Sequence, residues 1–164
     1  MDFTRILRHL LTPAWRLTAA FSASAMKAIE AAIQHSEKSH NGQIRFAVEA
    51  ALHLSPLLHN VGARERARAA FSGLRVWDTE HNNGVLIYLL LADRNVEIIA
   101  DRGIDARIGT AEWERICRLM EAHFSAGRFE QGVTEGVRVI GEHLQRHFPG
   151  AGNNNELPDA PVIL

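Results

Sequence analysis

Cysteine is almost absent from this chain of 164 residues, which contains only Cys117. A single cysteine excludes an internal disulfide and every zinc site built from several cysteines. A single cysteine fits a reducing compartment. The N-terminus also lacks the basic start and unbroken apolar stretch of a signal peptide. We therefore expect a cytoplasmic protein. Cys117 itself lies on the apolar stripe of an expected helix, which predicts a small buried side chain and not a nucleophile.

Charge of one sign is not in excess either, because 18 basic residues face 19 acidic residues and the net charge is -1. Without a basic excess, no long-range field attracts nucleic acid, so we expect no nucleic-acid partner. An apolar run covers residues 84–92. A helix needs roughly 20 apolar residues to cross a bilayer, so we also expect no transmembrane segment.

The sequence motifs of several enzyme classes are missing as well. Gly84, Gly103 and Gly109 match neither a P-loop nor a dinucleotide-binding fingerprint. There is no nucleophile elbow and no HExxH pair, so a standard hydrolase site is not expected. His143 and His147 lie one helical turn apart and could reach one metal ion, although cationic residues are favoured near a helix C-terminus in any case.

What is present is the patterning of one globular α/β domain, with 46% hydrophobic and 23% charged residues. Residues 43–50 alternate, as in a strand with one buried face, whereas residues 84–92 are apolar throughout, as in a central strand. A helix predicted at 63–76 between these strands implies that they are parallel. A two-residue turn at 93–94 implies an antiparallel hairpin with residues 95–101. The sequence therefore predicts a mixed sheet.

Further helices are expected around this sheet. Ser24 is predicted to cap one helix, another begins at Thr110, and a last one covers residues 133–144. The stretch 52–62 shows no clean period and is predicted to be a loop. The segment 150–164 is rich in glycine, asparagine and proline, so we expect a loosely ordered tail.

Residues 1–20 are predicted to hold an N-terminal amphipathic helix, whose pattern stops at Pro13. We expect this helix to pack back onto the domain. The alternative is docking on a membrane surface or on a protein partner. The apolar residues at helical spacing are Phe3, Ile6, Leu7, Leu10 and Leu11.

Acidic and amide side chains gather where the predicted hairpin meets its flanking loop. Asp78 and Glu80 precede the apolar strand, and Asp101 ends the strand that pairs with it. We expect the three carboxylates to lie close together at one end of the sheet, because the hairpin register joins the two segments. Carboxylate oxygens suit hard cations, so these residues are predicted ligands of Ca²⁺ or Mg²⁺. Their predicted neighbours in the site are Asn82, Asn83 and Arg102.

The alternative is that these residues are only the solvated polar edges of a buried hairpin. In that case Arg102 pairs with one of the acids, and Asn83 with Gly84 merely makes a turn. The residues by themselves leave both alternatives open.

Four stretches carry a family resemblance: "EKSHNGQIRFAVE", "NGVLIYL", "DRNVEIIADRGI" and "FSAGRFEQGV". Together they resemble the TPM domain family over roughly residues 22–159, with the domain itself expected at 22–149. The resemblance implies a three-layer α/β/α sandwich around a small mixed sheet. Members occur in plastid lumens and in bacteria, often with a membrane anchor. Some are described as binding divalent cations, and some as acid phosphatases.

The chain departs from the common family pattern around the predicted site. Asn82 stands where an aspartate is common before Asn-Gly-Val, and Asp101 stands where a glycine is common. An acid is therefore missing at one position and gained at the other. Asn41 likewise replaces a common threonine before Gly42. Without a signal peptide or membrane helix, the chain resembles a soluble bacterial branch of the family.

These observations favour a binding or interaction domain that holds a divalent cation, because oxygen ligands cluster while no recognisable nucleophile does. The alternative function is a metal-assisted acid phosphatase acting on phosphomonoesters. In that mechanism the same acids hold an ion that polarises the phosphate, and Arg102 stabilises the developing charge.

Overall fold

The computed structural model describes residues 3–151 and 155–164. None of the helices in these ranges is both long enough and apolar enough to cross a bilayer. The helices are α1 (Phe3–Leu10), α2 (Ala14–Ala20), α3 (Ala23–Glu37), α4 (Leu54–Leu58), α5 (Ala63–Gly73), α6 (Arg102–Ile108), α7 (Thr110–Ser125) and α8 (Phe129–His147). The strands are β1 (Gln43–Glu49), β2 (Gly84–Leu90), β3 (Asn95–Ala100) and β4 (Val162–Ile163).

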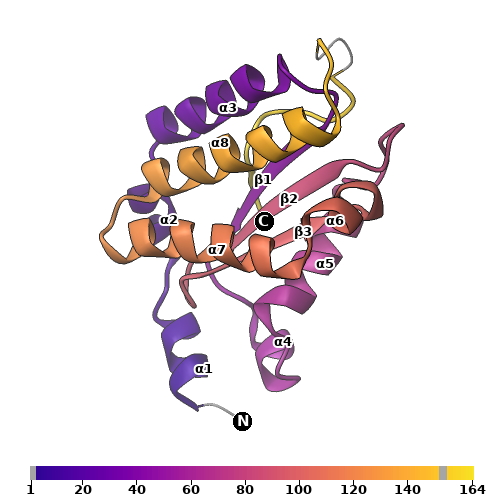
Figure 1. The fold of residues 1–164 in the computed structure, drawn as a ribbon. Helices are drawn as coiled ribbons and strands as arrows, with labels where there is room; N and C mark the ends of the chain where they lie inside the picture. The colour runs from indigo at the N-terminus through magenta and orange to yellow at the C-terminus, as the bar shows by residue number, and fades with distance from the viewer. Residues whose placement is uncertain (1–2, 152–154) are drawn as a thin grey trace.

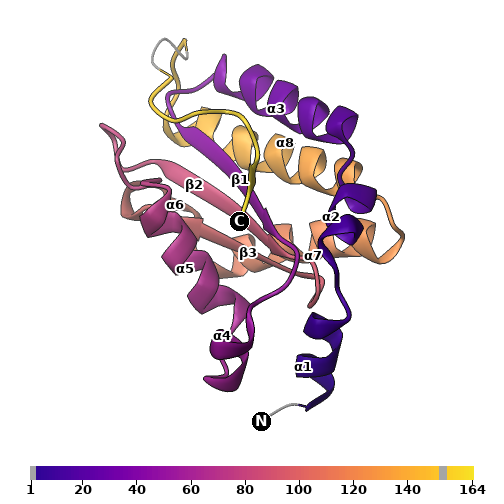
Figure 2. The same cartoon turned by 180° about the vertical axis from the view of Figure 1, so that it is seen from behind.

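The strands form one mixed sheet in the order β3-β2-β1-β4. β1 pairs in parallel with β2, from Gln43 opposite Gly84 to Glu49 opposite Leu90, and α4 and α5 lie in the connection between them. β2 and β3 form the predicted antiparallel hairpin. Helices α3, α7 and α8 cover one face of the sheet, and α5 lies on the other (Figure 1 and Figure 2). The predicted α/β/α sandwich is therefore confirmed.

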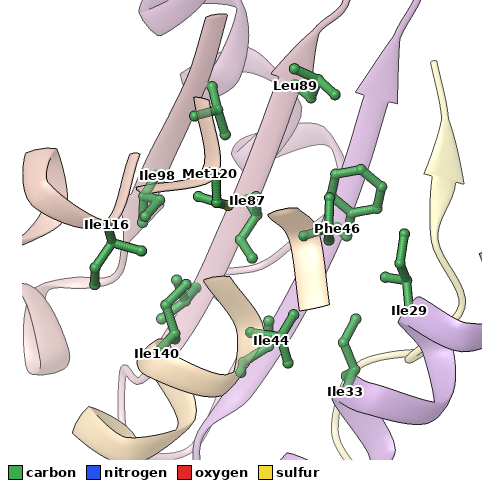
Figure 3. Close-up of a cluster of buried hydrophobic side chains, with 14 of the residues drawn as sticks. Ile29, Ile33, Ile44, Phe46, Ile87, Leu89, Ile98, Ile116, Met120 and Ile140 are labelled. Atoms are coloured by element: carbon green, nitrogen blue, oxygen red, sulfur yellow. The ribbon is translucent and has the colours of Figure 1, made fainter. Parts of the chain in front are cut away.

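The larger core lies between the sheet and the layer of α3, α7 and α8. Strand residues such as Ile44 lie there beside helix residues such as Ile140 (Figure 3), and Phe46 and Leu89 belong to the same core. A second core on the opposite face joins Tyr88 of β2 to Ala67 of α5 and to side chains of the loop regions. Apolar side chains alternate into these two cores, so the central strand β2 is buried on both faces, as predicted.

Strand β1 was expected to have one solvated face, but all seven of its residues are buried. Its polar side chains are covered by α5 and by the C-terminal segment, and they are paired. The Glu49 carboxylate accepts hydrogen bonds from Arg66 at 2.8 Å and from the Tyr88 hydroxyl at 2.6 Å. Arg45 donates to the carbonyl of Pro158. The alternating pattern therefore marks two buried faces, one apolar and one lined by paired polar groups.

The C-terminal segment is part of the sheet, which corrects the expectation of a loosely ordered tail for residues 155–164. The Oε1 atom of Gln43 accepts hydrogen bonds from the backbone N–H groups of Glu156 and Leu157, each at 2.9 Å. β4 then pairs in parallel with β1, and the Leu164 N–H donates to Val48 O at 3.0 Å. The composition of the segment predicted disorder. It could not reveal the partners that order the segment, because they are more than 100 residues away in the sequence. Residues 152–154 of the predicted tail lie outside the described residues.

Several local predictions also differ from the structure. The segment predicted as a loop contains α4, since Pro56 falls in the first turn, where a missing N–H does no harm. The cap of α3 is Ser22 and not Ser24, because Ser22 Oγ accepts the Ala25 N–H at 3.2 Å. The hairpin turn has four residues, Leu91 to Arg94, since Leu90 pairs with Asn95. Helices α2 and α6 were not predicted.

Candidate functional site

The structure joins the loop before β2 to the point where β3 ends and α6 begins. The Asp101 N–H donates to the Gly84 carbonyl at 2.9 Å, which closes the hairpin. A methyl group on Gly103 would lie 2.5 Å from the Asn82 carbonyl oxygen, so only glycine allows this close backbone approach. The two segments that hold the predicted ligands are therefore in contact through their backbones.

The predicted ligand side chains have different surroundings. Asp78 and Glu80 are exposed, whereas Asp101 is buried with 9% exposure. Among the described residues, no group of three or more carboxylate, histidine or cysteine side chains is placed to hold a metal ion. The three acids therefore do not form a ready cluster, and cation binding remains a prediction.

Two oxygens beside the start of β2 are buried and receive no hydrogen bond from any described residue. They are Oδ2 of Asp101 and Oδ1 of Asn83. The remaining polar atoms of both side chains are used. Asp101 Oδ1 accepts the Arg102 N–H at 2.8 Å at the N-terminus of α6, and Asn83 Nδ2 donates to Asn41 O at 3.1 Å. Both side chains are thus fixed with one oxygen left over.

A further acid joins this end of the sheet from the C-terminal segment. Glu156 Oε2 accepts the backbone N–H of Glu80 at 2.8 Å, across 76 residues of sequence. Glu156 was not predicted to belong to the site, because the C-terminal segment was expected to be loose. Arg102 was expected to pair with an acid if these residues were only the polar edges of a hairpin. It is exposed, and no described carboxylate lies within ion-pair distance of it. The arrangement therefore offers carboxylate and amide oxygens as ligands.

Two other predicted groups have ordinary structural roles. His143 Nε2 lies 2.8 Å from Glu112 Oε1, so this histidine has a carboxylate partner on α7. Burial, reinforced by nearby Glu97, raises the pKa of the Cys117 thiol to about 12. A thiol with such a pKa has almost no thiolate near neutral pH, which agrees with the prediction that Cys117 is not a nucleophile.

A second surface of interest is formed by α1, which is held on the domain by its polar side. The Arg5 guanidinium lies 3.0 Å from Asp93 Oδ2 and also donates to Val61 O at 2.9 Å. His9 Nδ1 accepts the Leu52 N–H at 2.9 Å, and its Nε2 lies 3.1 Å from Asp93 Oδ1. Burial lowers the pKa of His9, which fits a neutral ring that accepts this bond.

The helix thus lies on the domain, as expected, but through its polar side, and its apolar side points away from the domain. Phe3 is 79% exposed and Leu10 is 64% exposed, while Ile6 alone of the predicted stripe packs against the second core. In both views α1 projects from the body at the same end as α4 (Figure 1 and Figure 2). We call the exposed apolar residues of α1, of α2 and of the segment between them the docking face: Phe3, Leu7, Leu10, Leu11 and Trp15.

Comparisons with known proteins agree with this fold. The family model of the TPM domain matches residues 16–143. The NMR structure of the BA42 protein from the psychrophilic bacterium Bizionia argentinensis has a TM-score of 0.76 and 29% identity, over 88% of this chain and 95% of that chain. The N-terminal domain of a P. gingivalis protein has the same fold, with a TM-score of 0.63 and 18% identity over 79% and 82% of the two chains. No curated protein matches.

Proposed function

This chain belongs to the TPM domain family, and we propose that it is a binding module that holds a divalent cation, Ca²⁺ or Mg²⁺, beside the start of β2. The observation that carries the proposal is the pair of buried oxygens, Asp101 Oδ2 and Asn83 Oδ1, that accept no hydrogen bond from a described residue. A buried carboxylate oxygen without a donor is unfavourable, and a hard cation would compensate it.

The donor set fits such an ion in chemistry and in charge. Asp101 and Asn83 would hold it with a carboxylate and an amide oxygen, while Asp78, Glu80 and Glu156 add negative charge to the same end of the sheet. When bound, the cation supplies a fixed positive charge there. A site with so few charged ligands belongs with the weak calcium sites, so we expect a Kd on the order of 10⁻⁴ to 10⁻³ M.

We predict that Ca²⁺ or Mg²⁺ shifts the backbone amide resonances of Asn83, Gly84 and Asp101 in a chemical-shift titration. Asp101→Asn should weaken binding at least about 10-fold, because it removes the charged ligand. The melting temperature should change little, since asparagine caps a helix as well as aspartate does. The matched control is Glu114→Gln on α7, which removes an exposed charge and should leave binding unchanged. Shifts confined to His143 and His147, or identical titrations for Asp101→Asn and wild type, would contradict the proposal.

The same variants separate the binding module from the metal-assisted phosphatase. Wild type is incubated with a phosphomonoester and each cation. Turnover that disappears in Asp101→Asn and persists in Glu114→Gln would support the enzyme. Titration shifts without turnover would support the module.

We also propose that the module attaches to a membrane surface through α1 and α2. The observation that favours this second function is the outward orientation of the docking face, whose apolar side chains are left in water because the polar side of α1 binds Asp93. Arg8, Arg16 and Arg94 lie beside this face, which suits an anionic lipid surface. A cytoplasmic location, which the single cysteine favours, would supply such a surface.

We predict that the chain binds vesicles of phosphatidylcholine and phosphatidylglycerol. The double variant Leu10→Ala, Trp15→Ala should bind them about 10-fold more weakly or worse, because burial of each side chain in the membrane contributes over about 1 kcal/mol. Co-sedimentation gives the affinity. Trp77→Ala is the matched control, because Trp77 is also about half exposed but lies at the opposite end of β2, and it should bind as wild type does. Vesicle binding unaffected by the double substitution, or self-association through this face in sedimentation velocity, would overturn the attachment.

A further inference from the structure

A cavity of about 660 Å³ opens beside the docking face, at the end of the sheet opposite to the proposed cation site. Leu91 and Ala92 line it, and they directly follow the carboxyl end of β2. The crevice outside the carboxyl ends of parallel strands is where open α/β sheets commonly bind ligands. Its volume is within the usual range for small-molecule sites. Thr12 and Gly127 lie on other parts of its wall.

The charged side chains of the cavity are three arginines and one aspartate. Asp93 is already compensated, because the guanidinium groups of Arg5 and Arg8 both lie within 3.2 Å of its carboxylate. By contrast, neither Arg16 nor Arg94 is within ion-pair distance of any of the described carboxylates. The cavity therefore has an excess of positive charge that the protein itself does not neutralise.

The fold sets the positions of both uncompensated arginines. Arg94 ends the β2–β3 turn with a positive φ of 50°, and its N–H donates to Leu91 O at 3.0 Å. Arg16 lies on α2, with its guanidinium 5.9 Å from the ring centre of Trp15 in the docking face. Apart from Thr12, the rest of the lining is apolar and includes Ala20 and Phe129. A fitting ligand is thus an oxyanion attached to an uncharged, partly apolar group.

We propose that this cavity binds the phosphate group of an anionic phospholipid while the docking face lies on the membrane. The inference rests on the proposed membrane attachment. Arginine matches phosphate because its planar guanidinium can donate two parallel hydrogen bonds. Arg8 and Arg16 belong to the helices that carry the docking face, so insertion of that face brings lipid headgroups to the mouth of the cavity. The acyl chains remain in the bilayer beside Leu10 and Trp15.

The test compares two double variants that change net charge equally. Arg16→Gln with Arg94→Gln alters the cavity, whereas Arg68→Gln with Arg118→Gln alters exposed positions on α5 and α7. Each arginine at an anionic surface contributes about 5-fold in affinity, so the cavity variant should bind phosphatidylglycerol vesicles about 25-fold more weakly than wild type. The control should lose less than about 2-fold. Unchanged melting temperatures for both variants verify their folds.

A second measurement locates the headgroup. Short-chain phosphatidylglycerol below its micelle concentration should shift the amide resonances of Thr12, Leu91 and Gly127 in wild type and not in the cavity variant. Equal vesicle affinities for the two double variants would overturn the cavity assignment while leaving membrane attachment intact. Absence of any vesicle binding by wild type would overturn the attachment itself. Inorganic phosphate that shifts the same resonances at micromolar concentration would show a site for free phosphate and would likewise overturn the lipid assignment.

Discussion

Replacement of Leu89 by alanine is expected to lower the free energy of unfolding by about 2 to 5 kcal/mol. Leu89 has 0% exposure and lies in the middle of the larger core. It sits on the central strand, opposite Val48 of β1 and Val96 of β3 (Figure 3). Val48 belongs to β1, which is paired on both sides, so it can move little to fill the space. The loss therefore includes a cavity term besides the lost burial.

Denaturant unfolding measures this effect as a shift of the midpoint at constant slope. The matched control is Leu58→Ala on α4, because Leu58 is about half exposed and its removal should change stability by less than about 1 kcal/mol. A loss below about 1 kcal/mol for Leu89→Ala would show that the core around β2 does not have the packing described above.

The second large effect concerns Glu37, the last residue of α3. Burial, together with the nearby Asp159 carboxylate, raises the pKa of Glu37 to about 8, although its carboxylate accepts the Ile44 N–H at 2.8 Å. In the unfolded chain the same carboxyl ionises near its ordinary pKa of about 4.3. The folded state therefore retains a proton that the unfolded state has lost, and stability must fall as pH rises through this interval.

The clearest window lies between about pH 6.5 and 8. Burial lowers the pKa of His40 to about 4, so its neutral form is favoured in the folded state. This histidine makes stability rise with pH below about 6.5 and opposes the Glu37 effect there. Above that pH the histidine is neutral in both states. His9 and His147, whose pKa values are also lowered, oppose the Glu37 effect in the same way at the lower end of this window. Among the described groups, the Glu37 proton then makes the largest difference between the two states, and it changes stability by at most about 1.4 kcal/mol for each pH unit.

We therefore expect wild type to lose about 1 to 2 kcal/mol between pH 6.5 and pH 8, and Glu37→Gln to show a flat profile there. Glutamine keeps an oxygen that can accept the Ile44 N–H, so the fold should survive. Denaturant unfolding across this range gives both curves, with exposed Glu114→Gln as the control that should follow wild type. Parallel curves for Glu37→Gln and wild type would show that Glu37 is ionised in the folded protein.

Local patterning was enough to predict the central elements. The unbroken apolar run at β2, the helical periods of α7 and α8, and the order of strands and helices follow from residues close together in sequence. Such patterns report which side chains avoid water, and in an α/β domain they allow few arrangements. The family resemblance and the three-layer sandwich rest on these same stretches.

The candidate site was predictable only in part. Hairpin pairing explains why the loop before β2 meets the end of β3. Pairing does not fix the directions of the side chains. In the structure, Asp78 and Glu80 are exposed to solvent, whereas Asp101 is buried and caps α6. Sequence spacing also gave no sign of Glu156, because that residue arrives through the pairing of Gln43 with the C-terminal segment. Contacts across more than 100 residues leave no local pattern.

The sequence by itself determined that this chain makes a mixed sheet with β2 at its centre and an amphipathic helix at the N-terminus. Only the tertiary structure decided which way that helix faces. An amphipathic pattern states that a helix has two different sides, and burial of the apolar side is the usual result. Here Asp93, at a hairpin turn 88 residues from Arg5, binds the polar side at 3.0 Å and leaves the apolar side in water. The ion pair depends on where the turn is placed in space, which the helix sequence does not contain.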